Sequence, residues 1–181
     1  MKNYKIKIQY DGTRYKGWQV QKSTDMTIQG KIQDVLSAMA GQEIEVIGSG
    51  RTDAGVHAYG QVANFHLPKH FKKDEILDYL NHYLPMDIAV LNIEEVDERF
   101  HARYHAESKT YIYRIHTSKI PNVFERKYMY TYTEKLDVDE MRNAAKNTED
   151  IPRILESKIR ENAGYTVPAE GLILYNVIYE I

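Results

Sequence analysis

The stretch Tyr4-Lys5-Ile6-Lys7-Ile8-Gln9-Tyr10 places an apolar or aromatic side chain at every second position. A period of two is that of a β-strand with one face in the core and the other in solvent. The stretch therefore predicts a half-buried strand at the start of the fold. The first ten residues also lack the apolar run of a signal peptide, so we expect none.

Five further elements are expected after this strand. Apolar residues at three- and four-residue spacing predict helices over 27–40 and 74–84, which are followed by Gly41 and Pro85. Short runs predict strands over 43–47, 61–66 and 88–96. The order β-α-β-β-α-β is that of a split βαβ, or ferredoxin-like, unit with its helices on one face of an antiparallel sheet. The other face is then free for a ligand, as in RNA-binding modules of similar topology.

The second half of the chain begins near Phe100 and has fewer elements. We expect strands over 109–116, 127–133 and 172–181, and helices over 137–146 and 151–159. Asp137 and Glu140 have the spacing of a capping box at the start of the first of these helices. The two helices follow each other almost without a connection, so this half is short of strands for a lobe that would match the first.

The composition restricts the class of protein. Hydrophobic residues make up 43% and charged residues 28% of the chain, as in a globular protein, and no apolar run is long enough for a transmembrane helix. The absence of cysteine excludes disulfides, thiolate metal sites and a cysteine nucleophile, and it suits a cytoplasmic enzyme. A net charge of −2 leaves RNA binding open, because binding depends on a local basic face. The 15 tyrosines fit core packing or stacking on bases.

The loop 48–60 holds four glycines and contains an arginine, a carboxylate and an imidazole within seven residues: Arg51, Asp53 and His57. A guanidinium two residues from Asp53 can keep its carboxylate ionised, and an ionised carboxylate in a cleft can act as a nucleophile. The structural alternative is a turn in which Asp53 caps local amides and pairs with Arg51. The glycine spacing matches no nucleotide-binding motif, and neither His57 nor the pair His101 and His105 forms a metal-binding pattern.

The loop forms the motif Gly50-Arg51-Thr52-Asp53-Ala54-Gly55-Val56-His57. Other motifs along the chain are Tyr10-Asp11-Gly12, Gly17-Trp18-Gln19, Thr27-Ile28-Gln29-Gly30, Gly60-Gln61-Val62-Ala63-Asn64-Phe65, Leu84-Pro85, Phe100-His101-Ala102-Arg103, Lys109-Thr110-Tyr111-Ile112-Tyr113 and Ala169-Glu170-Gly171-Leu172. In this order, and along nearly the whole chain, these motifs resemble those of the TruA family of tRNA pseudouridine synthases.

The resemblance implies an α+β fold: two ferredoxin-like lobes, residues 1–99 and 100–181, share a mixed, mainly antiparallel sheet with a cleft between them. It implies that Asp53 is the nucleophile, that Arg51 helps to extrude the base and pairs with Asp53, and that Tyr111 stacks on the uracil and serves as general base. Arg103 and Lys109 would face the RNA. His57 would either contact RNA or support the loop.

The implied substrate is tRNA, modified at uridines 38 to 40 of the anticodon stem-loop, and the implied assembly is a homodimer. Pseudouridine formation breaks the C1′–N1 bond and forms a C1′–C5 bond without gain or loss of atoms. We therefore expect no cofactor and no metal. The first rival interpretation is a non-catalytic RNA-binding module. The second is a small-molecule enzyme that uses Asp53 as a base, which a narrow apolar cleft without basic walls would favour.

The chain departs from the family near Lys146 and Thr148. Several dozen residues separate the corresponding helices in the family, and they carry an arginine that pairs with the catalytic carboxylate. Here the two predicted helices are nearly continuous. The sequence therefore predicts either a deletion or an omitted segment, and with a true deletion a catalytically impaired RNA-binding remnant becomes the better interpretation.

Overall fold

The computed structural model describes residues 1–146 and 166–180. Its first six elements are β1 (Lys2–Tyr10), α1 (Ile28–Ala40), β2 (Val46–Gly48), β3 (His57–Leu67), α2 (Lys73–Tyr83) and β4 (Ile88–Val96). The predicted order β-α-β-β-α-β is confirmed. β3 begins four residues earlier than the sequence pattern indicates, because His57 and Ala58 pair with a strand from the far end of the chain.

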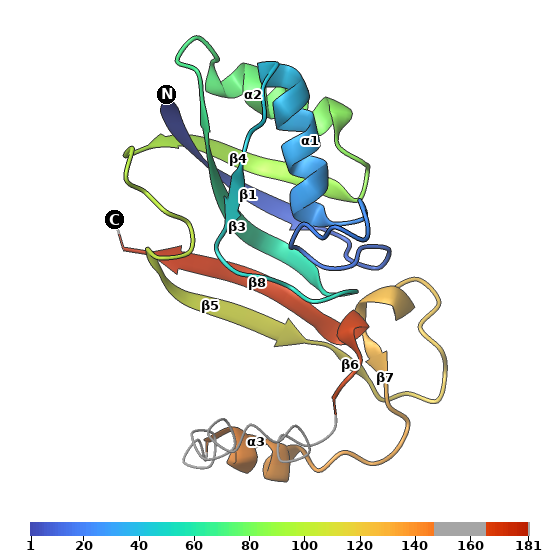
Figure 1. Cartoon of the computed structure of the whole chain (residues 1–181). Helices are drawn as coiled ribbons and strands as arrows, with labels where there is room; N and C mark the ends of the chain where they lie inside the picture. The colour runs from blue at the N-terminus through green and yellow to red at the C-terminus, as the bar shows by residue number, and fades with distance from the viewer. Residues whose placement is uncertain (147–165, 181) are drawn as a thin grey trace.

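A six-stranded sheet in the order β4-β1-β3-β8-β5 forms the centre of the fold (Figure 1). β1 lies antiparallel to β3 and to β4. β8 (Leu172–Tyr179) runs antiparallel to β5 (Ala106–Tyr113) and pairs in parallel with β3 only at His57 and Ala58. β2 pairs with the other end of β3, so β2 and β8 share one edge of β3 and the loop 49–56 lies between them. The sheet is thus mixed and mainly antiparallel, as predicted.

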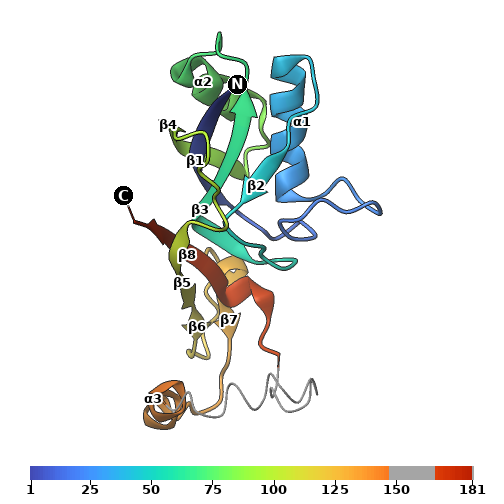
Figure 2. The same ribbon diagram turned by 60° about the vertical axis from the view of Figure 1, so that its left-hand side comes forward.

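The core lies between this sheet and the two helices, α1 and α2, which cover one of its faces (Figures 1 and 2). The alternation read from the sequence decides which side chains of β1 enter the core, and the helical spacing does the same for the helices. The side chains Tyr4, Ile6, Ile8, Ile28, Ile32, Leu36, Ile76 and Leu80 are all buried. Thr27 caps α1 by accepting a hydrogen bond from the Gly30 N–H, and Gly41 ends it with φ 65°.

The second half of the chain differs from its prediction in two strands. The strand expected over 109–116 is β5 followed by the short β6 (Ile115–His116), because the chain changes partners at Arg114. The Arg114 N–H donates to Gly171 O, and its carbonyl accepts from the Tyr130 N–H. The strand expected over 127–133 is only β7 (Tyr130–Thr131), preceded by the 3-10 helix η1 (Arg126–Tyr128).

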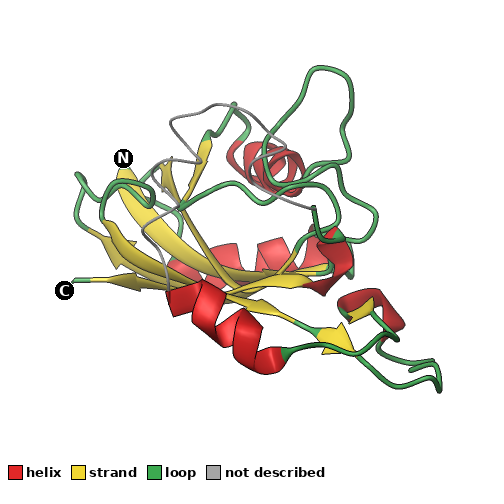
Figure 3. Ribbon diagram, turned by 90° about the horizontal axis from the view of Figure 1, so that it is seen from below, coloured by secondary structure: helices red, strands yellow, loops and turns green. Residues whose placement is uncertain are grey.

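Two helical elements complete the described second half, α3 (Val138–Lys146) and the 3-10 helix η3 (Ala169–Gly171). Asp137 accepts a hydrogen bond from the Glu140 N–H at the start of α3. α3 lies at the end of the molecule opposite α1 and α2 (Figure 2). Seen from below, the strands of the six-stranded sheet form a twisted layer (Figure 3), whereas β6 and β7 pair with each other in a separate two-stranded sheet. The helix predicted over 151–159 lies outside the described residues. The division into lobes 1–99 and 100–181 stays a prediction.

The loop 49–56 is held against the segment that follows β1. The Trp18 N–H donates to Thr52 O at 2.9 Å, and the Thr52 hydroxyl hydrogen-bonds the Tyr10 hydroxyl at 2.8 Å. Gly17 (φ 95°) lies so close that a Cβ would come within 2.6 Å of Thr52 O. Gly48, at the start of the loop, packs on the indole of Trp18, where a Cβ would come within 2.6 Å of the ring. The close contact of Gly17 with the Thr52 carbonyl, and of Gly48 with the Trp18 ring, therefore requires glycine at both positions.

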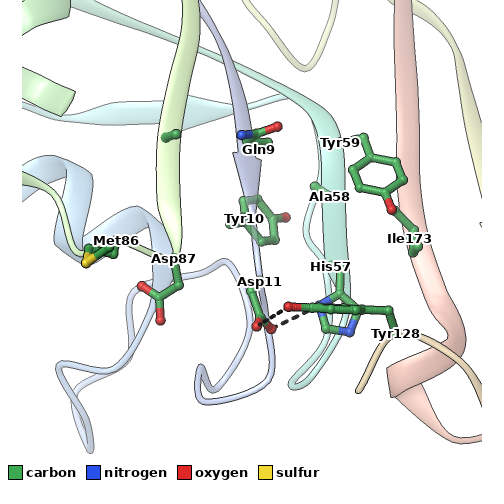
Figure 4. Close-up of a pocket in the computed structure, with 11 residues that line it drawn as sticks. Gln9, Tyr10, Asp11, His57, Ala58, Tyr59, Met86, Asp87, Tyr128 and Ile173 are labelled. Carbon is green, nitrogen blue, oxygen red and sulfur yellow. Dashed lines mark hydrogen bonds and ion pairs between the residues drawn. The ribbon is translucent and has the colours of Figure 1, made fainter. Parts of the chain in front are cut away.

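Asp11, His57 and Tyr128 join the second half of the chain to this scaffold (Figure 4). The Gly12 N–H donates to His57 Nδ1 at 3.0 Å, and Asp11 Oδ1 lies 3.3 Å from the same nitrogen. The Tyr128 hydroxyl donates to Asp11 Oδ2 at 3.0 Å, and its ring packs edge-on against the imidazole. Asp11 thus connects the end of β1, the start of β3 and η1.

The buried imidazole of His57 is neutral in this arrangement. Because Nδ1 accepts a hydrogen bond from an amide, the ring proton lies on Nε2. Burial lowers the pKa of His57, and the Asp11 carboxylate and the carbonyls of Lys127 and Glu170 oppose that shift only in part. Nε2 has no hydrogen bond of ordinary geometry among the described residues.

The charge state of His57 predicts a dependence of stability on pH. Burial places the folded-state pKa below the ordinary 6.5, so between the two values the unfolded chain binds a proton that the folded chain does not. The free energy of unfolding should therefore fall as the pH falls below about 6.5. His57→Gln keeps an acceptor for the Gly12 N–H and removes the titration. Urea unfolding at about pH 7.5 and pH 5.5 should show a smaller fall in the free energy of unfolding between the two pH values for this variant than for the wild type.

His82→Gln, on the exposed surface of α2, is the matched control and should keep the wild-type dependence. An equal loss of stability in His57→Gln and in the wild type would show that His57 contributes nothing to it.

The contact between Gly48 and Trp18 predicts different costs for two neighbouring glycines. Gly48→Ala should destabilise the fold by about 1–3 kcal/mol, because the buried indole cannot move away from the new methyl group. At Gly50 a Cβ would meet only the flexible end of Lys109, at 3.1 Å, so Gly50→Ala should change stability by about 0.5 kcal/mol or less. Trp18 is the only tryptophan, so its fluorescence reports unfolding in both variants. Equal stability of the two variants would contradict the expected clash.

Candidate functional site

The loop 49–56 exposes two charged side chains on either side of a buried one. Thr52 is buried, with its hydroxyl on Tyr10 and its carbonyl on the Trp18 amide, whereas Arg51 and Asp53 are exposed. Burial raises the pKa of Tyr10 to about 12, so its hydroxyl stays protonated and serves as a neutral anchor for Thr52. Ser49 and Gln61 fix the start of the loop through the Ser49 hydroxyl, which donates to Gln61 Oε1 at 2.7 Å.

A pocket of about 430 Å³ opens beside this loop, between the end of β2, the turn 101–104 and β5. Its volume is in the range of sites for small ligands or single nucleotides. The lining residues are Trp18, Gln19, Gln29, Glu45, Val46, Ile47, Gly48, Gly50, Arg51, His101, Arg103, Tyr104, Lys109 and Tyr111.

Four of the six predicted site residues meet in this pocket: Arg51, Arg103, Lys109 and Tyr111. They come from the loop, the turn and β5, which are far apart in the sequence. The ammonium group of Lys109 lies over Gly50, where a Cβ would come within 3.1 Å of it. Three cations thus surround a pocket whose one acidic lining residue is Glu45, which is unlike the narrow apolar cleft required by the small-molecule interpretation.

Asp53 is not among the residues that line this pocket, but its carboxylate is near enough to Tyr111, which does line it, to act on it electrostatically. Tyr111 is half-exposed, and its pKa is raised first by burial and then by the negative charge of the Asp53 carboxylate. That electrostatic effect requires the two side chains to be close. An exposed carboxylate and a half-exposed phenol therefore lie within electrostatic reach of each other beside a cationic pocket, and such a carboxylate can act as a nucleophile on an electron-poor base.

The structure does not bring all the predicted residues together. No ion pair within 4.0 Å joins Arg51 to Asp53 in the described parts of the chain. His57 lies outside the pocket, only 3% exposed, against Asp11 and Tyr128. Its place fits the support of the loop better than contact with RNA, the other role that the sequence left open for it.

Ten residues of the pocket lining were not predicted as site residues, and three of them have aromatic rings: Trp18, His101 and Tyr104. Trp18 and His101 lie within the motifs that carry the family resemblance, but neither residue type indicates by itself whether it packs in a core or lines a site. Tyr104 could have been found only through the unusual number of tyrosines, which indicated stacking on bases as one possible use.

The described residues contain neither a metal-binding cluster nor a membrane-spanning helix. No three or more His, Asp or Glu side chains there are grouped so as to hold a metal ion. In that same part of the chain, no helix is long and apolar enough to cross a membrane. A second pocket, of about 280 Å³, lies over Asp11, His57 and Tyr128 and belongs to the junction between the two halves (Figure 4).

Comparison with known proteins identifies one family in two ways, through a family model and through individual relatives. Residues 6–105 match the family described as tRNA pseudouridine synthase. The chain is 53% identical over 147 residues to "tRNA pseudouridine synthase A 2" of a Bacillus cereus strain, which covers 81% of this chain and 60% of that protein. It is 49% identical over 172 residues to "tRNA pseudouridine synthase A 1" of Clostridium tetani, which covers 93% of this chain and 69% of that protein.

A third relative is aligned over its whole length. "tRNA pseudouridine synthase A" of Acetivibrio thermocellus is 33% identical over 245 residues, which cover 99% of this chain and 100% of that protein. Because this chain has 181 residues, the relative contains a stretch without counterpart here. The chain spans about 60% of the length of the Bacillus relatives that it matches. With one match over more than half of its residues and another over nearly all of them, the chain belongs to the tRNA pseudouridine synthase family.

Proposed function

We propose that this protein isomerises uridine to pseudouridine in tRNA, with Asp53 as the nucleophile. The observation that carries the proposal is an exposed carboxylate beside Tyr111, at the side of a pocket lined by Arg51, Arg103 and Lys109. The three cations suit the phosphates on either side of an extruded uridine, and the pocket is large enough for a base. The names of the relatives support the same reaction.

The proposed reaction balances without a cofactor. The bond from C1′ to N1 breaks, the base turns, C1′ bonds to C5, and the C5 proton leaves while N1 gains a proton. The Asp53 carboxylate either adds to C6 of the uracil or captures C1′ as the glycosidic bond breaks. Both routes require a carboxylate that reaches the base and a group that accepts the C5 proton.

Tyr111 is the proposed acceptor of the C5 proton and the proposed stacking partner of the uracil. In the free protein, burial and the charge of Asp53 raise its pKa, so it rests as a phenol. A phenol is a poor base under those conditions. Once the Asp53 carboxylate has formed a covalent bond, its charge is gone and one of the two causes of the raised pKa disappears. Covalent attack by Asp53 therefore makes it easier for Tyr111 to release its hydroxyl proton to water, and the phenolate that remains accepts the C5 proton.

Several finer features belong to the same proposal. Arg51 fills the space that the extruded base leaves, which offsets part of the cost of unstacking, roughly a few kcal/mol. The uridines are those at positions 38 to 40 of the anticodon stem-loop, the assembly is a homodimer, and the site of action is the cytoplasm. The two ferredoxin-like lobes, residues 1–99 and 100–181, place the RNA in the cleft between them. The resemblance to the TruA family supports each of these features.

The second candidate function is a catalytically impaired RNA-binding protein. One observation favours it: relatives contain a stretch that has no counterpart here, and in the family we expect that stretch to carry an arginine paired with the catalytic carboxylate. The cationic pocket serves RNA binding in either case. The two candidates therefore differ in turnover and agree on binding.

Asp53→Asn tests the nucleophile. The change removes a negative charge at nearly constant volume, so it should abolish turnover while RNA binding stays within about tenfold. Turnover is measured as release of tritium from C5 of uridine in unmodified tRNA, and binding by filter retention of the same tRNA. Asp78→Asn, at an exposed position of α2, is the matched control and should keep full activity. Activity of Asp53→Asn equal to that of the wild type would refute the role. Binding by the wild type without tritium release would establish the second candidate function.

Tyr111→Phe tests the proton acceptor. The variant keeps a ring that can stack on uracil and loses the hydroxyl, so turnover should fall by about 100-fold or more with little change in tRNA affinity. Tyr175→Phe, half-exposed on β8, loses the same hydroxyl away from the pocket and should behave as the wild type. If tritium release is unchanged in Tyr111→Phe, Tyr111 does not accept the C5 proton.

A further inference from the structure

The turn 101–104 carries an exposed aromatic side chain at the mouth of the pocket. Tyr104 is 76% exposed, and its ring lies stacked on that of His101 with centroids 4.1 Å apart and planes 27° apart. Both side chains line the same pocket as Arg51 and Lys109. One ring face of Tyr104 is thus covered by His101, while the side chain as a whole remains largely accessible to solvent.

The inner ring of this pair is fixed by the backbone of its own turn. His101 Nδ1 accepts hydrogen bonds from the N–H groups of Arg103 at 3.2 Å and of Tyr104 at 3.3 Å. The His101 N–H donates to His105 Nδ1 at 3.3 Å. An imidazole held in this way gives the Tyr104 ring a surface of defined orientation. The Tyr104 side chain therefore loses little conformational freedom when a ligand binds.

The turn is also anchored to the sheet. Ala102, between the two rings in sequence, is fully buried. Its N–H donates to Asn64 Oδ1 at 2.8 Å, and its carbonyl accepts from the Tyr179 hydroxyl at 2.7 Å. Asn64 lies on β3 and Tyr179 on β8, so the stacked pair is attached to two strands of the central sheet, and β3 is the strand that follows the loop of Asp53.

We propose that Tyr104 and His101 form a second base-binding subsite, on which the nucleobase next to the target uridine stacks. This inference rests on the proposed function, because it assumes RNA in the pocket. A base beside an extruded uridine loses a stacking neighbour, and the exposed ring of Tyr104 replaces it. Arg103, between the two aromatic residues, and Lys109 lie where they can meet the phosphates of the same nucleotides.

The chemistry of the subsite favours a nucleobase over other ligands. An apolar ligand would require an aromatic ring enclosed by other apolar groups, whereas Tyr104 is largely exposed to solvent and lines a pocket that also contains three cations. All four bases present a flat π-face, and the pair of rings offers no arrangement of donors and acceptors around that face. The subsite should therefore increase affinity without selecting the identity of the stacked base.

Binding of a short anticodon stem-loop RNA tests the subsite independently of catalysis. The RNA carries 2-aminopurine next to the target uridine, and all proteins carry Asp53→Asn, so that no turnover occurs. In this background Tyr104→Ala should raise Kd about tenfold and remove the quenching of 2-aminopurine that stacking causes, whereas Tyr104→Phe should stay within about twofold. Tyr83→Ala, which removes a 58% exposed tyrosine on α2, is the matched control and should change neither value.

The outcomes separate this inference from the proposed function. Unchanged affinity and quenching in Tyr104→Ala would overturn the subsite and leave the role of Asp53 as it stands. Binding that depends on Tyr104, in a protein whose wild type releases no tritium, would overturn the catalytic proposal and keep the subsite. With an active Asp53, Tyr104→Ala should raise KM and leave kcat near the wild-type value, since stacking acts on binding alone.

Discussion

The burial of Thr52 between two exposed charged residues determines the geometry of the whole site. Its hydroxyl is tied to Tyr10 on β1 and its carbonyl to the amide of Trp18, so Arg51 and Asp53 on either side remain outside the core. Glycines at positions 17 and 48 allow this loop to approach so closely. The strands and helices of the first half of the chain thus form a scaffold that holds the backbone on either side of Thr52, including that of Asp53, in a fixed place.

Local patterns were sufficient for the first half of the fold and insufficient for parts of the second. β1, α1 and α2 follow the periodicities of their own side chains, because each buries one face against the same core. β3 and the strands near Arg114 depend on partners distant in sequence. β3 is lengthened where β8 pairs with His57 and Ala58, and the strand after Tyr113 breaks where Arg114 changes partners. No local window of sequence contains such pairings.

The candidate site likewise contains residues that the sequence predicted and residues whose position depends on distant partners. The residue types and spacing around Asp53, together with the family resemblance, predicted six site residues, and the structure brings five of them into or beside the pocket. The place of His57 could not be predicted, because its burial depends on Asp11 and on Tyr128, which lie far from it in sequence. Tyr104 was missed for a related reason: only the attachment of Ala102 to Asn64 and Tyr179 brings that turn to the pocket.

The exposure of Asp53 explains why it forms no ion pair with Arg51 among the described residues. In the free protein, water solvates the carboxylate, so nothing requires a cation beside it. A base that enters the pocket would displace that water, and an unpaired carboxylate away from water is costly. Arg51 is exposed, has a long side chain and lies two residues from Asp53 in the sequence. The arginine that we expect in the additional stretch of the Acetivibrio thermocellus relative has no counterpart among the described residues. If RNA enters the pocket as proposed, we therefore expect it to draw Arg51 onto Asp53, so that the loop itself supplies a positive charge beside the carboxylate.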